Sequence, residues 1–308
     1  MRAAALLLGV VADAAFGDPR RYHPVAGYGV AAAALERRLW RPSRRAGLGY
    51  AVVLVAGPAA AAALLERRLG RSPGRRLLVT AGAAWSVIGG RSLAQEATRL
   101  GRLLEAGNLE EARRAAPALM GRDPTRLDAS ELCRGAIESV AENTADAAVG
   151  PLLWGAVLGL PGLIAYRASN TLDAMVGHRN ERYQEFGWAS ARLDDVLTFV
   201  PARLAALLTA ACATGVGGST GSSWRILRRD GRSHPSPNAG QLEAAFAGAL
   251  DLQLGGASCY DGLVEQRPTL GDGRVASPPD IQRAVRLSRA VIALAAVVCA
   301  TLAFQIER

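Results

Sequence analysis

Residues 287–304, with the sequence LSRAVIALAAVVCATLAF, decide the fold class. The stretch is almost entirely apolar, and about 20 such residues let an α-helix cross a lipid bilayer. Arg283 and Arg286 come just before it and Arg289 lies near its start, as basic residues commonly flank membrane helices. The stretch therefore predicts a transmembrane helix.

Similar apolar stretches recur towards the start of the chain, at residues 3–16, 48–65, 77–90, 147–165 and 196–216. The first lacks a convincing cleavage site, so we expect a retained membrane helix and not a signal peptide. The third is shorter than the about 20 residues that a crossing needs. Pro151 and Pro161 interrupt the fourth stretch and Pro201 the fifth, so these two are predicted to be broken or re-entrant helices.

Three polar regions, residues 91–146, 167–195 and 217–286, separate the apolar stretches. In the first of them Leu93, Ala97, Leu100 and Leu104 follow helical spacing, which indicates amphipathic helices. We therefore predict an all-α fold: a polytopic helical membrane protein with broken or re-entrant helices and amphipathic helical loops. Residues 1–308 are expected to form a single integral membrane domain.

The orientation in the membrane is ambiguous from sequence. Residues 36–45 and 66–76 are both basic yet flank one candidate span, so the positive-inside rule cannot satisfy both if that segment crosses once. If the proline-containing segments are broken or re-entrant, the three polar regions can meet on one side of the bilayer. We expect a multi-pass protein of the cell membrane whose active face is cytoplasmic.

The charge of the chain excludes several function classes. The net charge is +9, and all 36 basic residues are Arg. Without Lys the chain can form neither a Schiff base nor a Walker-type phosphate loop, so any phosphate contacts must use Arg. We exclude a nucleic-acid partner, because only 5% of residues are aromatic and no nucleic-acid-binding motif occurs. Arginines beside apolar spans more often contact anionic lipid or set topology.

One group of charged residues precedes the apolar stretch 147–165. Arg134, Glu138 and Glu142 are four residues apart, so on a helix they share one face. A solvated, self-paired helix face explains such spacing too, at a few tenths of a kcal/mol per pair. Asn143 and Asp146 continue the group towards the membrane, where ionisable groups are costly to place, and this favours a functional role.

A second group surrounds residues 167–203. It combines Arg167, Asn170 and Asp173 with the adjacent acids Asp194 and Asp195. Carboxylates hold Mg²⁺ through oxygen, and arginines neutralise phosphate oxygens. The alternative for the two adjacent acids is that they merely cap or solvate a helix start.

Histidines and cysteines give no metal-binding motif. His23, His178 and His234 are scattered and are more often hydrogen-bonded structural residues than ligands. The four cysteines are far apart and form no C-x-x-C pair, so a zinc site or redox dithiol is not expected.

The ordered motifs identify a family resemblance. The chain resembles the adenosylcobinamide-phosphate synthase family, the membrane enzymes of cobalamin biosynthesis, over nearly its whole length. The motifs that carry the resemblance are Asp13…Gly17-Asp18-Pro19…His23-Pro24-Val25…Gly29, Gly121-Arg122-Asp123, Glu138…Glu142-Asn143…Asp146…Pro151, Arg167…Asn170-Thr171-Leu172-Asp173, Met175-Val176-Gly177, Phe186-Gly187, Ala191-Arg192-Leu193-Asp194-Asp195, Pro201-Ala202-Arg203-Leu204, Ser236-Pro237-Asn238-Ala239-Gly240, Ala247-Gly248-Ala249-Leu250, Leu254-Gly255-Gly256 and Tyr260…Gly262. The family pattern usually has Ser at Ala174 and Asn at Thr198, which puts an essential role for these two positions in doubt.

The resemblance implies an amide ligase that uses ATP and Mg²⁺. Such an enzyme joins the propionate of adenosylcobyric acid to aminopropanol or its O-phosphate, with the propionate activated as an acyl phosphate. The implied partners are this corrinoid, the amino alcohol, the lipid bilayer and other cobalamin-pathway membrane enzymes. Spacing alone does not show which acid deprotonates the incoming ammonium.

Residue roles follow from combining the resemblance with the two charged groups. The expected catalytic residues are Glu142, Asp173, Asp194 and Asp195. The expected Mg²⁺ ligands are Glu142, Asp146, Asp173, Asp194 and Asp195. The residues expected to bind phosphate or propionate are Arg134, Arg167, Asn170, Arg179, Arg192 and Arg203, together with Asn143 and Asn238.

Two other functions fit parts of the sequence. A membrane phosphotransferase acting on an alcohol would need a longer array of spaced aspartates than Asp194-Asp195 provides. A transporter or a non-catalytic assembly subunit would agree with broken spans and intramembrane charge.

Overall fold

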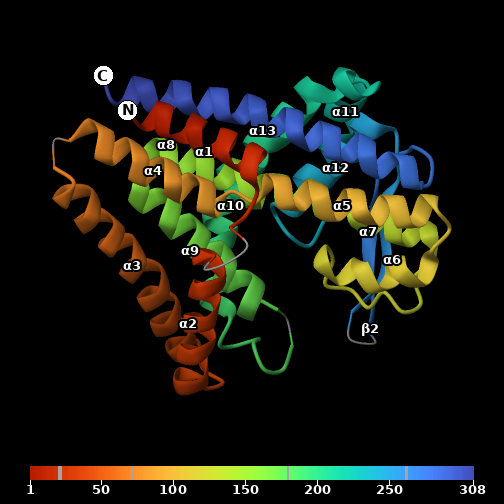
Figure 1. Cartoon of the computed structure of the whole chain (residues 1–308). Coiled ribbons are helices and arrows are strands. Elements are labelled where there is room, and N and C mark those ends of the chain that lie inside the picture. Colours follow the sequence, from red (N-terminus) through yellow and green to blue (C-terminus); the bar gives the residue numbers. More distant parts are fainter. Residues whose placement is uncertain (20–22, 71, 179, 261–262) are drawn as a thin grey trace. The chain divides into compact units, whose positions relative to one another are not determined.

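The computed structural model is almost entirely helical (Figure 1). It describes residues 1–19, 23–70, 72–178, 180–260 and 263–308, without the side chains of residues 257–260 and 263–265. The α-helices are α1 (Arg2–Phe16), α2 (Pro24–Leu39), α3 (Arg44–Arg68), α4 (Pro73–Val87), α5 (Gly90–Glu105), α6 (Leu109–Ala115), α7 (Ala129–Thr144), α8 (Gly150–Leu158), α9 (Leu160–Val176), α10 (Trp188–Cys212), α11 (Thr220–Asp230), α12 (Ala239–Leu250) and α13 (Pro278–Ile306). Short helical turns are η1 (Ala116–Ala118), the π-helical η2 (Ala145–Val149) and η3 (Ala213–Val216).

One antiparallel hairpin interrupts the helical fold, formed by β1 (Leu254–Tyr260) and β2 (Leu263–Leu270). Its register shifts between Gly255 and Gly256, which both have positive φ (77° and 87°). A Cβ atom on Gly255 would lie 2.1 Å from the carbonyl oxygen of Pro268, so only glycine fits there. The sequence prediction contains no strand, and this hairpin is the exception to it.

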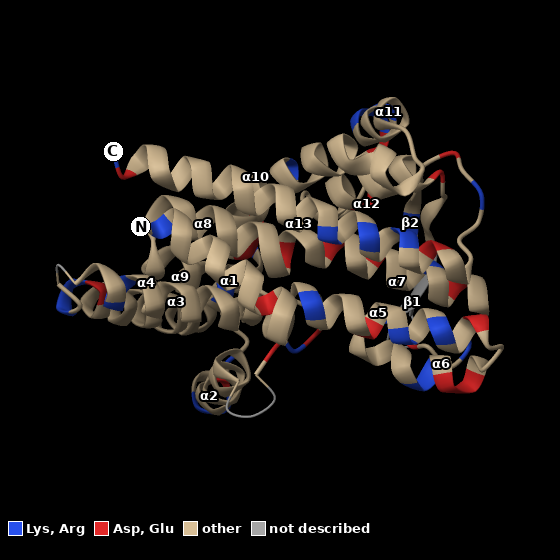
Figure 2. Ribbon diagram, turned by 45° about the horizontal axis from the view of Figure 1, so that its top comes forward, with Lys and Arg blue, Asp and Glu red and all other residues tan. Residues whose placement is uncertain are grey.

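Four helical segments among the described residues are long and apolar enough to cross a membrane: Arg44–Arg68, Pro73–Glu105, Trp188–Val216 and Pro278–Ile306. The last two contain the predicted spans 287–304 and 196–216. In Figure 2, α10 and α13 have long uncharged stretches, whereas charged residues crowd α6 and also α5, which is the second half of the segment Pro73–Glu105. The prediction of a polytopic, all-α membrane protein is therefore confirmed.

The two proline-containing stretches differ in outcome. Residues 147–165 are broken at Gly159, whose φ of 70° ends α8 before α9 begins, and the two helices pack together as a helical hairpin. Residues 196–216 instead belong to α10, which continues through Pro201 to Cys212, so this stretch is not broken there. One proline removes a single backbone hydrogen bond, which a helix in a membrane protein tolerates.

The chain divides into two compact units, each built from separate segments. Unit 1 consists of Met1–Gly89, Asp146–Thr198 and Ala295–Arg308, and unit 2 of Gly90–Ala145 and Phe199–Leu294. Of the four boundaries, two fall within α10 and α13, one falls within η2 and one lies just before α5, so neither unit is a continuous piece of sequence.

Unit 1 is held together by packing of α1 on α4, α3 on α9, and α8 on α9. Its core includes Tyr50 from α3, Leu172 from α9 and Phe186 from the segment before α10. Small residues permit close helix contact: a Cβ on Gly150 would lie 2.1 Å from the Tyr166 ring, and one on Gly47 would lie 1.8 Å from the Phe186 carbonyl oxygen. Packing therefore fixes the position of α9 relative to the segment that precedes α10.

Unit 2 is formed around α5, α7, α11 and α12, with the hairpin packed on α7 and α12. Its fully buried core residues include Leu100, Leu132 and Phe246. Asp128 caps α7 by accepting a hydrogen bond from the backbone of Glu131, whose side chain reaches back to the Asp128 N–H.

Candidate functional site

In unit 1 the end of α9 and the start of α10 bring acidic residues together. Arg167, Asn170 and Asp173 are three residues apart on α9 and so share one face. Two glycines let the helix ends approach. A Cβ on Gly177 would lie 1.9 Å from a carboxylate oxygen of Asp173, and one on Gly187 would lie 1.7 Å from the carbonyl oxygen of Val176.

Asp194 is the buried member of this acidic cluster, with 7% of its surface exposed. Its Oδ2 accepts a hydrogen bond from Thr198 Oγ1 at 3.3 Å, and the Asn170 amide also donates to this carboxyl group. The carboxylates of Asp173 and Asp195 lie close enough to act on it electrostatically. Its Oδ1 is buried, with no hydrogen-bond partner in the described part of the chain. This oxygen therefore lacks the hydrogen-bond donor or cation that a buried carboxylate oxygen needs.

Asp173 shows the electrostatic character of the cluster. Burial raises the pKa of Asp173, the Asp195 carboxylate raises it further, and His178 acts in the opposite direction. Asp195 is more exposed and pairs with Arg192 at 3.4 Å. The cluster thus holds more negative charge than its own cations offset, which suits a bound cation.

Arg167 provides positive charge at the inner side of the same cluster. Its Nη1 lies 3.5 Å from Asn170 Oδ1, and the carboxylates of Asp18 and Asp146 act on it electrostatically. Tyr166, which precedes it, lies within range of both Asp146 and Asp194 and contacts the Thr198 hydroxyl at 3.1 Å. The structure therefore brings most of the predicted unit 1 residues together, whereas Arg179 lies outside the described residues.

The donor set fits Mg²⁺ that is shared with a phosphorylated ligand. Within the described chain, no three His, Cys, Asp or Glu side chains converge to enclose a metal by themselves. Mg²⁺ commonly takes only one or two protein carboxylates and completes its shell with water and phosphate oxygens. The free Oδ1 of Asp194 and the nearby Asp173 carboxylate meet that requirement.

The remaining predicted residues belong to unit 2. Arg203 on α10 donates to Asn238 Oδ1 and to the Pro237 carbonyl oxygen, both at 3.4 Å, so Arg203 and Asn238 are neighbours. Asn143 donates to the Ser139 carbonyl oxygen at 2.9 Å. Glu142 is exposed on α7. A role for these residues in catalysis or binding stays a prediction.

Comparison with known proteins decides the family. A family model described as CobD/Cbib protein matches residues 6–288. The chain belongs to the CobD/Cbib family. It is therefore a membrane protein of cobalamin biosynthesis, and the resemblance stated above is confirmed.

Relatives in the CobD/Cbib family cover the whole chain. The cobalamin biosynthesis protein CobD of Mycobacterium tuberculosis is 51% identical over 304 residues, which is 99% of this chain and 96% of the relative. The proteins of the same name from Geobacter metallireducens and Chromobacterium violaceum are 45% and 39% identical, over 87% and 92% of this chain and 86% and 90% of theirs. No solved structure matches.

The structure of this CobD/Cbib member also contains a buried ionic network in unit 2 that the sequence did not reveal. Arg122 and Glu138 form an ion pair in which both side chains are buried. Glu138 Oε1 accepts from the Gly255 N–H at 2.8 Å, and Arg134 donates to the Gly255 carbonyl oxygen. The predicted Arg134–Glu138 pair exists, at 3.9 Å, but on a buried face that fixes the base of the hairpin.

Glu243 on α12 completes this buried network. Burial raises the pKa of Glu243 well above its usual range, and the carboxylates of Glu138 and Glu142 raise it further. His234 Nε2 lies 3.9 Å from Glu243 Oε1, and His234 Nδ1 accepts from the Ser236 N–H. Arg122, Glu138 and Gly255 each belong to a motif that carries the family resemblance, but these motifs suggested no contact among the three, and Glu243 belongs to none of them.

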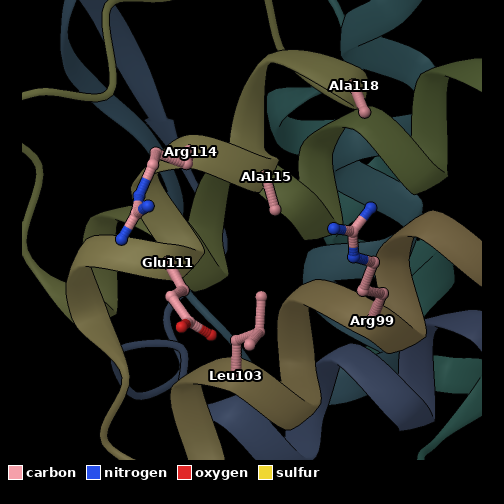
Figure 3. A pocket seen from close by; sticks show the side chains of 6 residues that line it. All are labelled: Arg99, Leu103, Glu111, Arg114, Ala115 and Ala118. Atoms are coloured by element: carbon pink, nitrogen blue, oxygen red, sulfur yellow. The ribbon is translucent and has the colours of Figure 1, made fainter.

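An open pocket of about 350 Å³ lies elsewhere in unit 2 (Figure 3). It lies on α5, α6 and η1, and its lining residues are Arg99, Leu103, Glu111, Arg114, Ala115 and Ala118. None of them is a predicted site residue, and none belongs to the acidic cluster of unit 1.

Proposed function

We propose that the chain is an ATP-dependent amide ligase. It attaches aminopropanol or its O-phosphate to the propionate of adenosylcobyric acid and so forms adenosylcobinamide or its phosphate. Membership of a cobalamin-biosynthesis family supports the corrinoid substrate. The buried Asp194 Oδ1, beside the Asp173 carboxylate, is the observation that carries the proposed use of metal-bound ATP.

The proposed reaction has two balanced steps. An oxygen of the propionate attacks the γ-phosphorus of ATP, and ADP leaves. The ammonium gives one proton to a carboxylate, and the amine nitrogen then attacks the acyl carbon. Inorganic phosphate leaves and takes the second proton from the nitrogen. Activation is needed because a carboxylate by itself is a poor acyl donor.

The residues of the acidic cluster divide the binding work in this proposal. Asp194 and Asp173 would hold Mg²⁺, which would offset the charge of the nucleotide phosphates, and Asp195 would add negative charge beside them. Arg167 and Asn170 contact phosphate or propionate oxygens from α9, for which the rigid guanidinium is suited. The absence of Lys is compatible with this chemistry, because Arg can bind the phosphates. It also means that no lysine amine of the chain competes with the amino alcohol for the activated propionate.

We also propose where the chain and its acidic cluster lie in the cell. The chain is placed in the cell membrane as a multi-pass protein, with the acidic cluster on the cytoplasmic side, where ATP is supplied. Contacts with other membrane enzymes of the pathway remain part of the proposal.

Reconstitution tests the proposed activity. The purified full chain in lipid nanodiscs is supplied with adenosylcobyric acid, aminopropanol phosphate and Mg²⁺–ATP, and mass spectrometry follows the amide product and ADP. We expect both products from the wild type and from Asp272→Asn, an exposed control, and neither from Asp194→Asn. Absence of amide from the wild type with either amino alcohol, or full activity of Asp194→Asn, would refute the proposal.

A further inference from the structure

Exposed arginines gather where α2 ends and α3 begins in unit 1. Arg37, Arg38, Arg41 and Arg45 are all exposed, and none forms an ion pair or side-chain hydrogen bond with another described residue. Figure 2 shows basic residues on α2. Their positive charge is therefore not offset by described side chains of the protein.

The acids beside these arginines are already occupied. Glu36 accepts from Arg182 Nη2 at 2.9 Å and from the Tyr183 hydroxyl at 3.0 Å. Glu185 pairs with Arg44 at 3.0 Å. The local excess of positive charge therefore remains after the internal pairs have formed.

Two tryptophans accompany the arginines. The guanidinium of Arg182 lies 4.8 Å from the centre of the Trp40 ring, and Trp40 Nε1 donates to the Arg182 carbonyl oxygen. Trp188 is 41% exposed and lies 5.4 Å from the guanidinium of Arg44. We call Arg37, Arg38, Trp40, Arg41, Arg45 and Trp188 the arginine–tryptophan patch.

The depth of the patch in the membrane follows from the helices that begin there. Arg44 is the first residue of α3 and Trp188 the first of α10, and both helices belong to candidate membrane spans. The 25 residues of α3 extend about 37 Å, longer than the about 30 Å hydrocarbon core, so the helix ends reach the headgroups. These residues therefore lie at the level of the lipid headgroups, where Trp is enriched in membrane proteins.

We propose that the arginine–tryptophan patch binds the headgroups of anionic phospholipids. The arginines contact the phosphates, which guanidinium groups bind with two parallel hydrogen bonds, and the indole rings pack at the boundary between headgroups and acyl chains. This interaction is independent of the proposed ligase activity. An acidic protein partner would require the patch to face away from lipid. Because the patch lies where two candidate spans begin, lipid is favoured over such a partner.

Native mass spectrometry of the full chain in detergent tests the proposal. Apparent dissociation constants are measured for palmitoyl-oleoyl phosphatidylglycerol and for the zwitterionic phosphatidylcholine. We expect tighter binding of phosphatidylglycerol by the wild type. Each arginine contributes about fivefold, so Arg37→Gln/Arg38→Gln should weaken that binding about 25-fold. Phosphatidylcholine binding should weaken much less, because its choline group offsets the phosphate charge.

A matched pair at the other end of α3 is the control. Arg67→Gln/Arg68→Gln removes the same charge as Arg37→Gln/Arg38→Gln, from the last turn of α3 and not of α2, away from the tryptophans. Arg41→Gln/Arg45→Gln is a second patch variant in case the first folds poorly, as judged by size-exclusion chromatography. Equal affinity of the wild type for both lipids, or equal losses in patch and control variants, would overturn the proposal.

Discussion

The buried pair of Arg122 and Glu138 makes a sharp stability prediction for the substitution Glu138→Gln. Glu138 is 6% exposed and Arg122 5% exposed, and the guanidinium binds Oε2 of the carboxylate. Arginine keeps its charge under all practical conditions, so the variant leaves a buried guanidinium without its counter-ion. The amide oxygen of Gln can still accept from the Gly255 N–H, which isolates the loss of charge.

The expected cost follows from this isolation. Removing one partner of a buried ion pair destabilises a protein by about 3–5 kcal/mol, because an uncompensated charge stays buried. Since the hydrogen bond to Gly255 can survive in Glu138→Gln, we expect the lower end of that range, about 3 kcal/mol.

Denaturant titration in detergent micelles, followed by circular dichroism, measures the unfolding free energy. The control is Asp272→Asn, which removes an exposed acid that pairs with Arg225 and Arg229. Exposed pairs contribute little, so the control should change stability by a small fraction of the Glu138→Gln effect. If the two variants are equally stable, the Arg122–Glu138 pair does not hold unit 2 together.

Three further outcomes test other parts of the structure. Gly47→Ala should lower stability by about 1–3 kcal/mol through overpacking against Phe186, whereas Gly49→Ala, with nothing within 4 Å, should not; equal melting temperatures would contradict this. Because burial raises the pKa of Glu243, the native state keeps a proton that the unfolded chain releases above about pH 4.3, so stability falls as pH rises. The melting temperature of Glu243→Gln relative to wild type should therefore rise between pH 5 and pH 8, and parallel curves would count against a buried, protonated Glu243. Asp173→Asn should lower ligase activity at least about tenfold, and an unchanged rate would remove this residue from the metal site. Because the pKa of Asp173 is raised, wild-type activity should be lost on acidification at a higher pH than an ordinary Asp would give.

The helices could be predicted from sequence because their signal is local. The apolar stretch 48–65 lies within four residues of both ends of α3. The stretches 196–216 and 287–304 identify the apolar parts of α10 and α13, which begin eight and nine residues earlier, and helical spacing indicates α5. The hairpin could not be predicted in this way. It depends on positive φ at Gly255 and Gly256, and a glycine in a sequence indicates freedom to adopt that geometry but not its use.

The candidate site was predictable where its residues are close in the chain. Asp173 and Asp194 lie on consecutive helices, and their density of charge beside apolar sequence gave the signal. No sequence pattern indicated that Glu243 and Arg122 belong to one buried network. The two residues are 121 positions apart, and helical spacing relates only residues within a few turns. Long-range partners of this kind require the tertiary structure.

The turn at Gly159 determines how membrane topology should be counted in unit 1. A Cβ at Gly159 would lie 3.0 Å from Arg2 Nε and 3.1 Å from Glu66 Oε1, so the turn packs beside the first residues of α1 and the last turn of α3. Asp146 and Asp173 flank the far ends of the same α8–α9 hairpin. Because α8 and α9 run in opposite directions, the hairpin adds no net crossing of the membrane. The segments before and after it therefore lie on the same side of the bilayer. Reporters of membrane side, fused before α8 and after α9, should therefore report the same compartment. A count that takes the apolar stretch 147–165 as one crossing would place them in opposite compartments.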